Sequence, residues 1–181
     1  KSLIVFGGKS KKKRSSIIVG SINNFEFSIK DNICKLSEVQ LSHNWFLYNK
    51  YQLKLIDYVC YMIDRLLFIE DNNSLVVDAY EELVNNLNER KDYMISFFIL
   101  ELNILKSSGY EPNLSYPIIS KILPIENYKD QDLTALFNLL DQNKEFQLTF
   151  FNFLGKIIER VLQNLNIKIP LSRNQIYEKS N

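Results

Sequence analysis

The run with the clearest chemical potential is Lys9–Arg14, which carries five positive charges in six positions. Lysine and arginine bind phosphate groups with an affinity that depends on salt but not on base sequence. Like charges this close would repel one another in a helix or a paired strand, so a loop is expected. The predicted DNA-binding residues are Lys9, Lys11, Lys12, Lys13 and Arg14. The alternative is a solvated basic loop that binds nothing.

Two further residues, Glu101 and His43, have side chains suited to acid-base catalysis. Glu101 lies in a long apolar segment, and burial there would raise a carboxyl pKa towards a catalytic range. The alternative is a buried acid paired with an arginine, for which Arg65, Arg160 and Arg173 are available. His43 has no triad context, because neither cysteine is a recognisable nucleophile. We therefore favour the structural interpretation and expect no catalytic residue and no enzyme activity.

The composition indicates a globular chain, since 46% of its 181 residues are hydrophobic and 24% are charged. No apolar run reaches the roughly 18 residues that a membrane span requires. Cys34 and Cys60 show neither a disulfide pattern nor the spacing of zinc ligands, which favours a reducing cytoplasm. The fragment at residues 7–10 lacks the first glycine and spacer of a P-loop. No metal and no cofactor are expected.

Charge is distributed unevenly, although the net charge is only +1. Residues 1–30 hold seven lysines and arginines against one acid, whereas residues 31–181 hold fifteen against twenty. A basic N-terminal segment thus precedes a mildly acidic body, and a polyanion partner would meet the basic segment first.

The N-terminal part is predicted to be β structure. A short apolar run before two glycines indicates a strand at Ser2–Phe6, and apolar residues that alternate at Phe25, Phe27 and Ile29 indicate a second strand at Ser16–Lys30. A third strand is expected at Ile33–Leu36. Asp31 and Asn32 are typical of a hairpin turn between the last two. We therefore expect residues 1–38 to form a β domain and residues 39–181 to form a helical domain.

The helical part shows apolar residues at steps of three and four. Helices are expected at about Tyr51–Ile69, from Ser74 onwards, from Asp92 to Ser108, at about Asp130–Leu140 and at about Glu145–Leu165. Gly109 suits the left-handed position that follows a helix C-terminus. Three prolines make the segment from Tyr110 to Tyr128 irregular.

Several patches together resemble the RecO family of bacterial DNA-repair mediators. The central patch comprises Phe98, Glu101, Leu102, Leu105, Gly109, Tyr110, Pro112 and Leu114. The N-terminal patches are Gly7-Gly8, Lys9–Arg14, Phe25–Ile29 and Leu36-Ser37-Glu38. The patches Leu148-Thr149, Phe151, Leu154 and Ile169-Pro170 with Arg173 are similar to alphaproteobacterial members.

The resemblance implies an α+β fold, in which a partial OB-like antiparallel β region is followed by an all-α helical domain. The first strands of the family's five-stranded barrel are absent from this sequence, which would leave a sheet edge exposed. The family's four-cysteine zinc element is also absent, because residues 114–130 contain no cysteine. A zinc-free version is implied.

The resemblance further implies a DNA repair and recombination mediator that binds single- and double-stranded DNA, promotes annealing and helps RecA load on coated single strands. Its implied partners are single-stranded DNA-binding protein and RecR. Lys168 and Arg173 are the expected partner-binding residues, beside apolar neighbours, and the alternative for them is an ordinary C-terminal cap. The alternative function is a non-enzymatic helical interaction scaffold without DNA binding.

Overall fold

The computed structural model describes residues 20, 22–30, 33–41, 48–68, 73–123, 132–170, 173 and 176. The chain divides into two compact units, Lys1–Asn49 and Lys50–Asn181. In the first unit, β1 (Asn23–Lys30) and β2 (Ile33–Leu41) pair antiparallel, with a register shift between Glu26 and Phe27. The predicted strand at Ser2–Phe6 lies outside the described residues.

The predicted fold class, α+β with a partial OB-like β region, is wrong, because the described structure is essentially helical. Within the described ranges the strands make one two-stranded hairpin and no larger sheet. The physical reason is that a local apolar pattern can predict a single strand. It does not show whether the chain supplies the additional strands that a barrel needs. A hairpin alone buries too little apolar surface to form a barrel-like domain.

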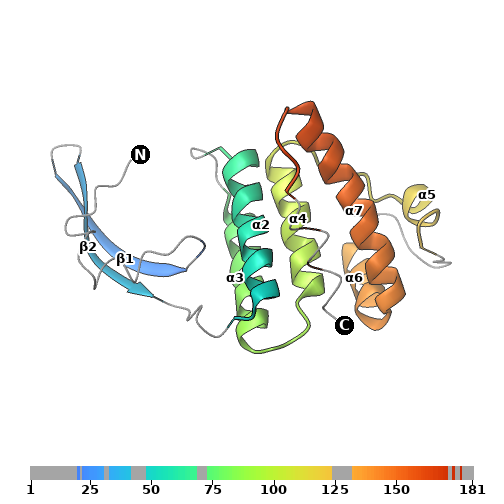
Figure 1. Cartoon of the computed structure of the whole chain (residues 1–181), viewed down its shortest axis with the longest axis horizontal. Helices are drawn as coiled ribbons and strands as arrows, with labels where there is room; N and C mark the ends of the chain where they lie inside the picture. The colour runs from blue at the N-terminus through green and yellow to red at the C-terminus, as the bar shows by residue number, and fades with distance from the viewer. Residues whose placement is uncertain are drawn as a thin grey trace. The chain divides into compact units, whose positions relative to one another are not determined.

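The second unit contains six helices within the described residues (Figure 1). These are α2 (Lys50–Leu66), α3 (Ser74–Asn88), α4 (Met94–Ser107), α5 (Tyr116–Ile119), α6 (Leu133–Gln142) and α7 (Lys144–Asn164). The five longer helices lie where the sequence predicts them, and α5 is a short helix inside the segment expected to be irregular. None of the helices in the described ranges is both long enough and apolar enough to cross a membrane.

Helix α4 is the centre of this unit. It contacts α2, α3, α6 and α7, and Figure 1 shows it between the first pair and the second. Apolar residues occupy every side of α4, which is the pattern of a helix enclosed by others. Its buried residues are Met94, Ser96, Phe97, Phe98, Leu100, Glu101, Leu102, Ile104 and Leu105.

Aromatic rings join α4 to its neighbours. Phe97 meets Tyr58 of α2 edge-on, with ring centroids 5.9 Å apart, and Phe98 meets Phe150 of α7 in the same way at 5.2 Å. Edge-to-face pairs at such separations add about 0.5–1.5 kcal/mol beyond the burial of their area. Aromatic contacts therefore join α4 to helices on both of its sides.

The C-terminus of α4 confirms the predicted role of Gly109, which adopts a φ of 83°. The Tyr110 amide donates to the Leu105 carbonyl at 2.8 Å, and the Gly109 amide donates to the Lys106 carbonyl at 3.0 Å. These two bonds form a Schellman motif, which satisfies carbonyls that the helix end would otherwise leave open. The chain turns away from α4 at this point.

Replacing Gly109 with alanine should lower the free energy of unfolding by about 1 kcal/mol, because an L side chain disfavours this φ. No atom lies within 4 Å of an added Cβ, so the cost should be purely conformational. The matched control is Gly109→Asn, which should cost less because asparagine tolerates the left-handed region. Urea denaturation measures both, and equal losses would contradict this explanation.

Candidate functional site

The most developed polar site is buried at the middle of α4. Tyr58 of α2 donates its hydroxyl to Glu101 Oε1 at 2.6 Å. Arg173, from the C-terminal segment, donates Nε to Oε1 and Nη2 to Oε2, each at 2.8 Å. The two parallel bonds make a bidentate arginine-carboxylate pair, the strongest and most directional form of this contact. We call Tyr58, Glu101 and Arg173 the buried triad.

Helix α7 forms the wall of the buried triad. The Arg173 guanidinium carbon lies 3.9 Å from the centroid of the Phe151 ring, a close cation-π contact. Gly155 lies one helical turn further along α7, and a Cβ there would come within 2.5 Å of Arg173 Nη1. The missing side chain at Gly155 therefore makes room for the guanidinium.

Burial and charge set the protonation states of Tyr58 and Arg173. Burial, together with the neighbouring Glu101 carboxylate, raises the pKa of Tyr58 well above its usual value. Burial alone would lower the pKa of Arg173, but attraction and hydrogen bonds from Glu101 outweigh it and raise the pKa. Tyr58 thus stays neutral and Arg173 stays charged across the physiological range. Neither group is suited to proton transfer near neutral pH.

The predicted pairing of Glu101 with an arginine is confirmed, and the partner is Arg173. Of the other two candidates, Arg65 pairs with Asp64 at 3.5 Å and Arg160 is exposed. Because both Glu101 oxygens accept hydrogen bonds inside a closed core, a substrate has no access to the carboxylate. The catalytic interpretation of Glu101 therefore has no site here.

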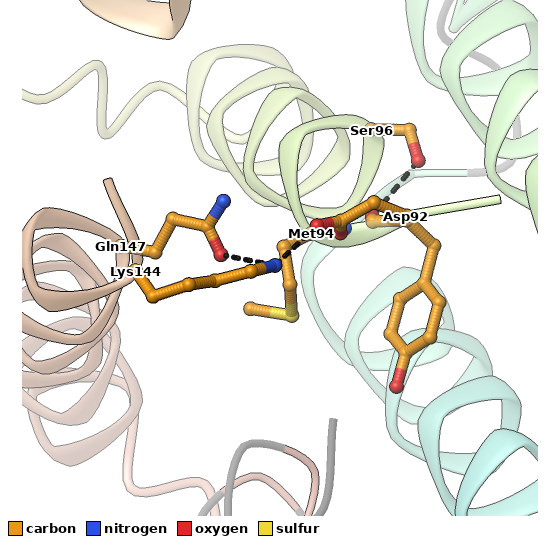
Figure 2. A network of polar contacts seen from close by, with 6 residues as sticks. Asp92, Met94, Ser96, Lys144 and Gln147 are labelled. Atoms are coloured by element: carbon orange, nitrogen blue, oxygen red, sulfur yellow. Dashed lines mark hydrogen bonds and ion pairs between the residues drawn. The ribbon is translucent and has the colours of Figure 1, made fainter. Parts of the chain in front are cut away.

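A second polar network links the start of α4 to the start of α7 (Figure 2). Lys144 Nζ donates to Asp92 Oδ2, and it also donates to Gln147 Oε1 at 3.3 Å. Asp92 Oδ1 accepts from the Met94 amide at 2.9 Å. Burial would raise the pKa of Asp92, but the hydrogen bonds from Lys144 and Met94 lower it. Gln147 is fully buried, and its Nε2 has no hydrogen-bond partner among the residues that the structure describes.

A surface cleft of about 680 Å³ follows the end of α4. It is lined by Leu102, Asn103, Lys106, Glu111, Pro112, Asn113, Leu114, Ser115 and Leu133. Lys106 and Glu111 pair with each other at 2.9 Å, and the Asn103 amide donates to the Leu75 carbonyl at 3.2 Å. Several of the cleft's polar side chains thus bond within the chain, and its described lining residues include no catalytic grouping.

The basic residues predicted to bind DNA, Lys9, Lys11, Lys12, Lys13 and Arg14, lie outside the described residues, as does His43. Lys168 has an exposed side chain, and its carbonyl accepts a hydrogen bond from the Tyr61 hydroxyl at 2.6 Å. Arg173 is only 6% exposed. The two predicted partner-binding residues therefore do not form one exposed surface, because one side chain is exposed and the other is buried.

Among the described residues, no group of three or more His, Cys, Asp or Glu side chains is arranged to hold a metal ion. Cys60 is a free thiol whose pKa is raised by burial, so the thiolate is disfavoured. Neither observation adds a reactive site.

Sequence reasoning missed Tyr58, Gly155 and the Asp92–Lys144–Gln147 network. One signal was available at Gly155, since a glycine in a helix interior costs stability and often marks a close approach. Tyr58 lies among apolar residues and has the pattern of an ordinary core aromatic. The contacts of Lys144 with Asp92 span 52 positions and follow no local pattern.

Comparison of the chain with family models, with curated proteins and with solved structures gave no match.

Breaking the buried pair should be severely destabilising. Glu101→Ala or Arg173→Ala alone should cost about 3–5 kcal/mol of unfolding free energy, because each leaves an unpaired buried charge. The double variant Glu101→Leu with Arg173→Met should recover part of that loss, since apolar residues of similar volume replace the pair while the Tyr58 hydroxyl loses its acceptor. Urea denaturation of the single and double variants measures the coupling. Single losses below about 1 kcal/mol would show a solvated pair instead.

The Asp92–Lys144 pair should contribute a small, pH-dependent stability. Because folding lowers the pKa of Asp92, its contribution is present above about pH 4 and is lost as the pH falls through the folded-state pKa. Both side chains are more than a third exposed, so the effect should be about 1 kcal/mol or less. The stability difference between the native chain and Asp92→Asn should therefore shrink from pH 7 to pH 2.5. A difference that stays constant over this range would contradict a charge-based contact.

Proposed function

We propose that the chain is a RecO-like DNA repair mediator that acts without catalysis, in a reducing cytoplasm. One observation carries the proposal. Glu101 and Arg173 belong to two separate patches of the resemblance, 72 positions apart, and they form a bidentate pair in the core. A contact between these two residues supports treating both patches as parts of one motif. The proposal does not include an OB-like barrel.

Under this proposal the basic run Lys9–Arg14 supplies DNA affinity. Its charges offset phosphate repulsion, so that complementary single strands can approach each other and anneal. The same charges would hold single- and double-stranded DNA without sequence preference. The residues assigned to this role are Lys9, Lys11, Lys12, Lys13 and Arg14.

The helical unit would provide the protein contacts, with single-stranded DNA-binding protein and RecR as partners, and would assist RecA loading. Lys168 is exposed and lies between two apolar residues, Ile167 and Ile169, which suits the acidic and hydrophobic tail of such a partner. Arg173 contributes indirectly in this scheme, because its guanidinium is bound to Glu101.

The second candidate is a helical interaction scaffold that binds no DNA. The observation that favours it is that several described charges of the helical unit form intramolecular pairs, including Lys106 with Glu111 and Lys144 with Asp92. Such a unit would recognise proteins through apolar surface rather than through charge.

Salt-titrated binding to a fluorescent single-stranded oligonucleotide distinguishes the two candidates. The mediator should bind with an affinity that falls steeply with salt. Changing Lys11, Lys12, Lys13 and Arg14 to alanine in the full chain should weaken binding. It should also flatten the log–log salt slope by about 0.7 for each phosphate that the variant no longer neutralises.

The charge-matched control replaces Lys91, Lys121, Lys156 and Arg160 with alanine, four exposed residues of the helical unit. This variant has the same net charge as the first but keeps the basic run, so it should bind nearly as the native chain does. Equal weakening of DNA binding in both variants would show that binding depends on net charge and not on the basic run. No binding by the native chain at low salt would favour the scaffold.

A further inference from the structure

Helix α3 has an exposed face that carries three acids. Asp78, Glu81 and Glu82 are exposed, and none of them forms an ion pair with another described residue. Spacings of three and four residues place them on one side of the helix, where like charges repel one another. Residues 66–89 hold six acids and no lysine, arginine or histidine, so no base within this stretch offsets the repulsion.

The most exposed large apolar side chains of the described residues lie in the same stretch. Phe68, just after α2, is 74% exposed, and Leu75 and Val77 in the first turn of α3 are 56% and 54% exposed. Asn73 Nδ2 donates to the Phe68 carbonyl at 3.3 Å, and Asn103 Nδ2 donates to the Leu75 carbonyl at 3.2 Å. Hydrogen bonds thus hold the backbone of exposed apolar residues of the kind that mark interaction sites.

We propose that this face of α3 is a docking surface for a basic protein segment that carries large apolar residues. We call it the acidic docking face, and its residues are Phe68, Leu75, Val77, Asp78, Glu81 and Glu82. Charge complementarity selects the partner, because its lysines and arginines pair with the acids while its apolar residues cover the exposed apolar side chains. Nucleic acid is excluded as the occupant, since its phosphates would meet three carboxylates.

The alternative is that the acids of α3 serve only to solvate the helix. Charged residues on a helix surface usually have that role. A face used only for solvation would gain stability from bases placed three or four positions from the acids, as in many exposed helices. In α3 the acids lack such bases and adjoin exposed apolar residues, which favours docking.

The test uses the full chain and a fluorescent synthetic peptide of about 14 residues. Its leucines occupy positions i, i+3, i+4 and i+7 of a helix, and lysines occupy most of the others. Fluorescence anisotropy should show saturable binding that weakens as salt is raised from about 0.05 to 0.5 M. The basic run Lys9–Arg14 repels this probe, so the assay and the proposal are independent of DNA binding.

A control peptide with glutamine in place of every lysine should not bind. Equal binding of the glutamine peptide would show a nonspecific apolar contact and overturn the proposal. No binding of the lysine peptide at millimolar concentration would also overturn it.

Two matched variants test the acids. The first neutralises the acids of the docking face through Asp78→Asn, Glu81→Gln and Glu82→Gln. The control neutralises three exposed acids of other helices through Asp57→Asn, Asp141→Asn and Glu159→Gln. The first should bind the lysine peptide about tenfold more weakly than the native chain, and the control should bind within about twofold of it. Equal weakening in both would show that only net charge matters and would overturn the proposal.

Two further variants test the apolar residues. The first truncates those of the docking face through Phe68→Ala, Leu75→Ala and Val77→Ala. The control truncates three other exposed leucines through Leu53→Ala, Leu148→Ala and Leu165→Ala. The first should lose about tenfold in affinity and the control about twofold or less. Equal losses would overturn the proposal.

Urea denaturation checks that the variants fold. Neutralising the acids relieves like-charge repulsion in α3, so that variant should unfold at a urea concentration no lower than the native chain does. If a triple variant does not fold, the single substitutions Glu81→Arg and Phe68→Ala replace it. Each should weaken binding at least about threefold, and unchanged binding in both would overturn the proposal.

Discussion

The bidentate pair between Glu101 and Arg173 is the interaction on which the helical unit most depends. A carboxylate buried at the centre of an apolar helix loses its hydration. This loss costs several kcal/mol of free energy, which a charged and hydrogen-bonded partner must compensate. Helix α2 supplies the Tyr58 hydroxyl, but the compensating charge comes from the segment that follows α7. An acid in α4 thus requires the chain to return to the core 72 positions later.

The aromatic packing around α4 makes this requirement strict. Phe97 and Phe98 are fully buried and contact rings of α2 and α7, so water is excluded from the middle of the unit. In such a dry environment a satisfied hydrogen bond is stronger and an unsatisfied group is more costly. The same packing therefore strengthens the buried triad and penalises every arrangement in which Arg173 is absent. The Nε2 of Gln147, which has no hydrogen-bond partner in the described part of the chain, is a smaller cost of the same kind.

Much of the helical unit could be predicted from sequence, because apolar periodicity and end signals are local. The helices and the left-handed Gly109 follow from spacing alone, and a buried acid predicts an arginine partner. The choice of Arg173 over Arg65 and Arg160 depends on tertiary packing, which spacing does not encode. The β prediction went too far for a related reason: alternation identifies strands, whereas a barrel also needs further strands to pair with β1 and β2. The basic run could be interpreted only by its charge.

The two polar links of α4 to later parts of the chain differ in energy, and this difference bears on function. The pair of Asp92 and Lys144 is partly exposed and contributes about 1 kcal/mol or less, whereas removal of one partner from the buried pair costs several times more. Both links pair opposite charges within the chain. With residues 31–181 carrying fifteen basic against twenty acidic residues, the body as a whole repels phosphate weakly. Any DNA affinity would then depend on the basic N-terminal segment.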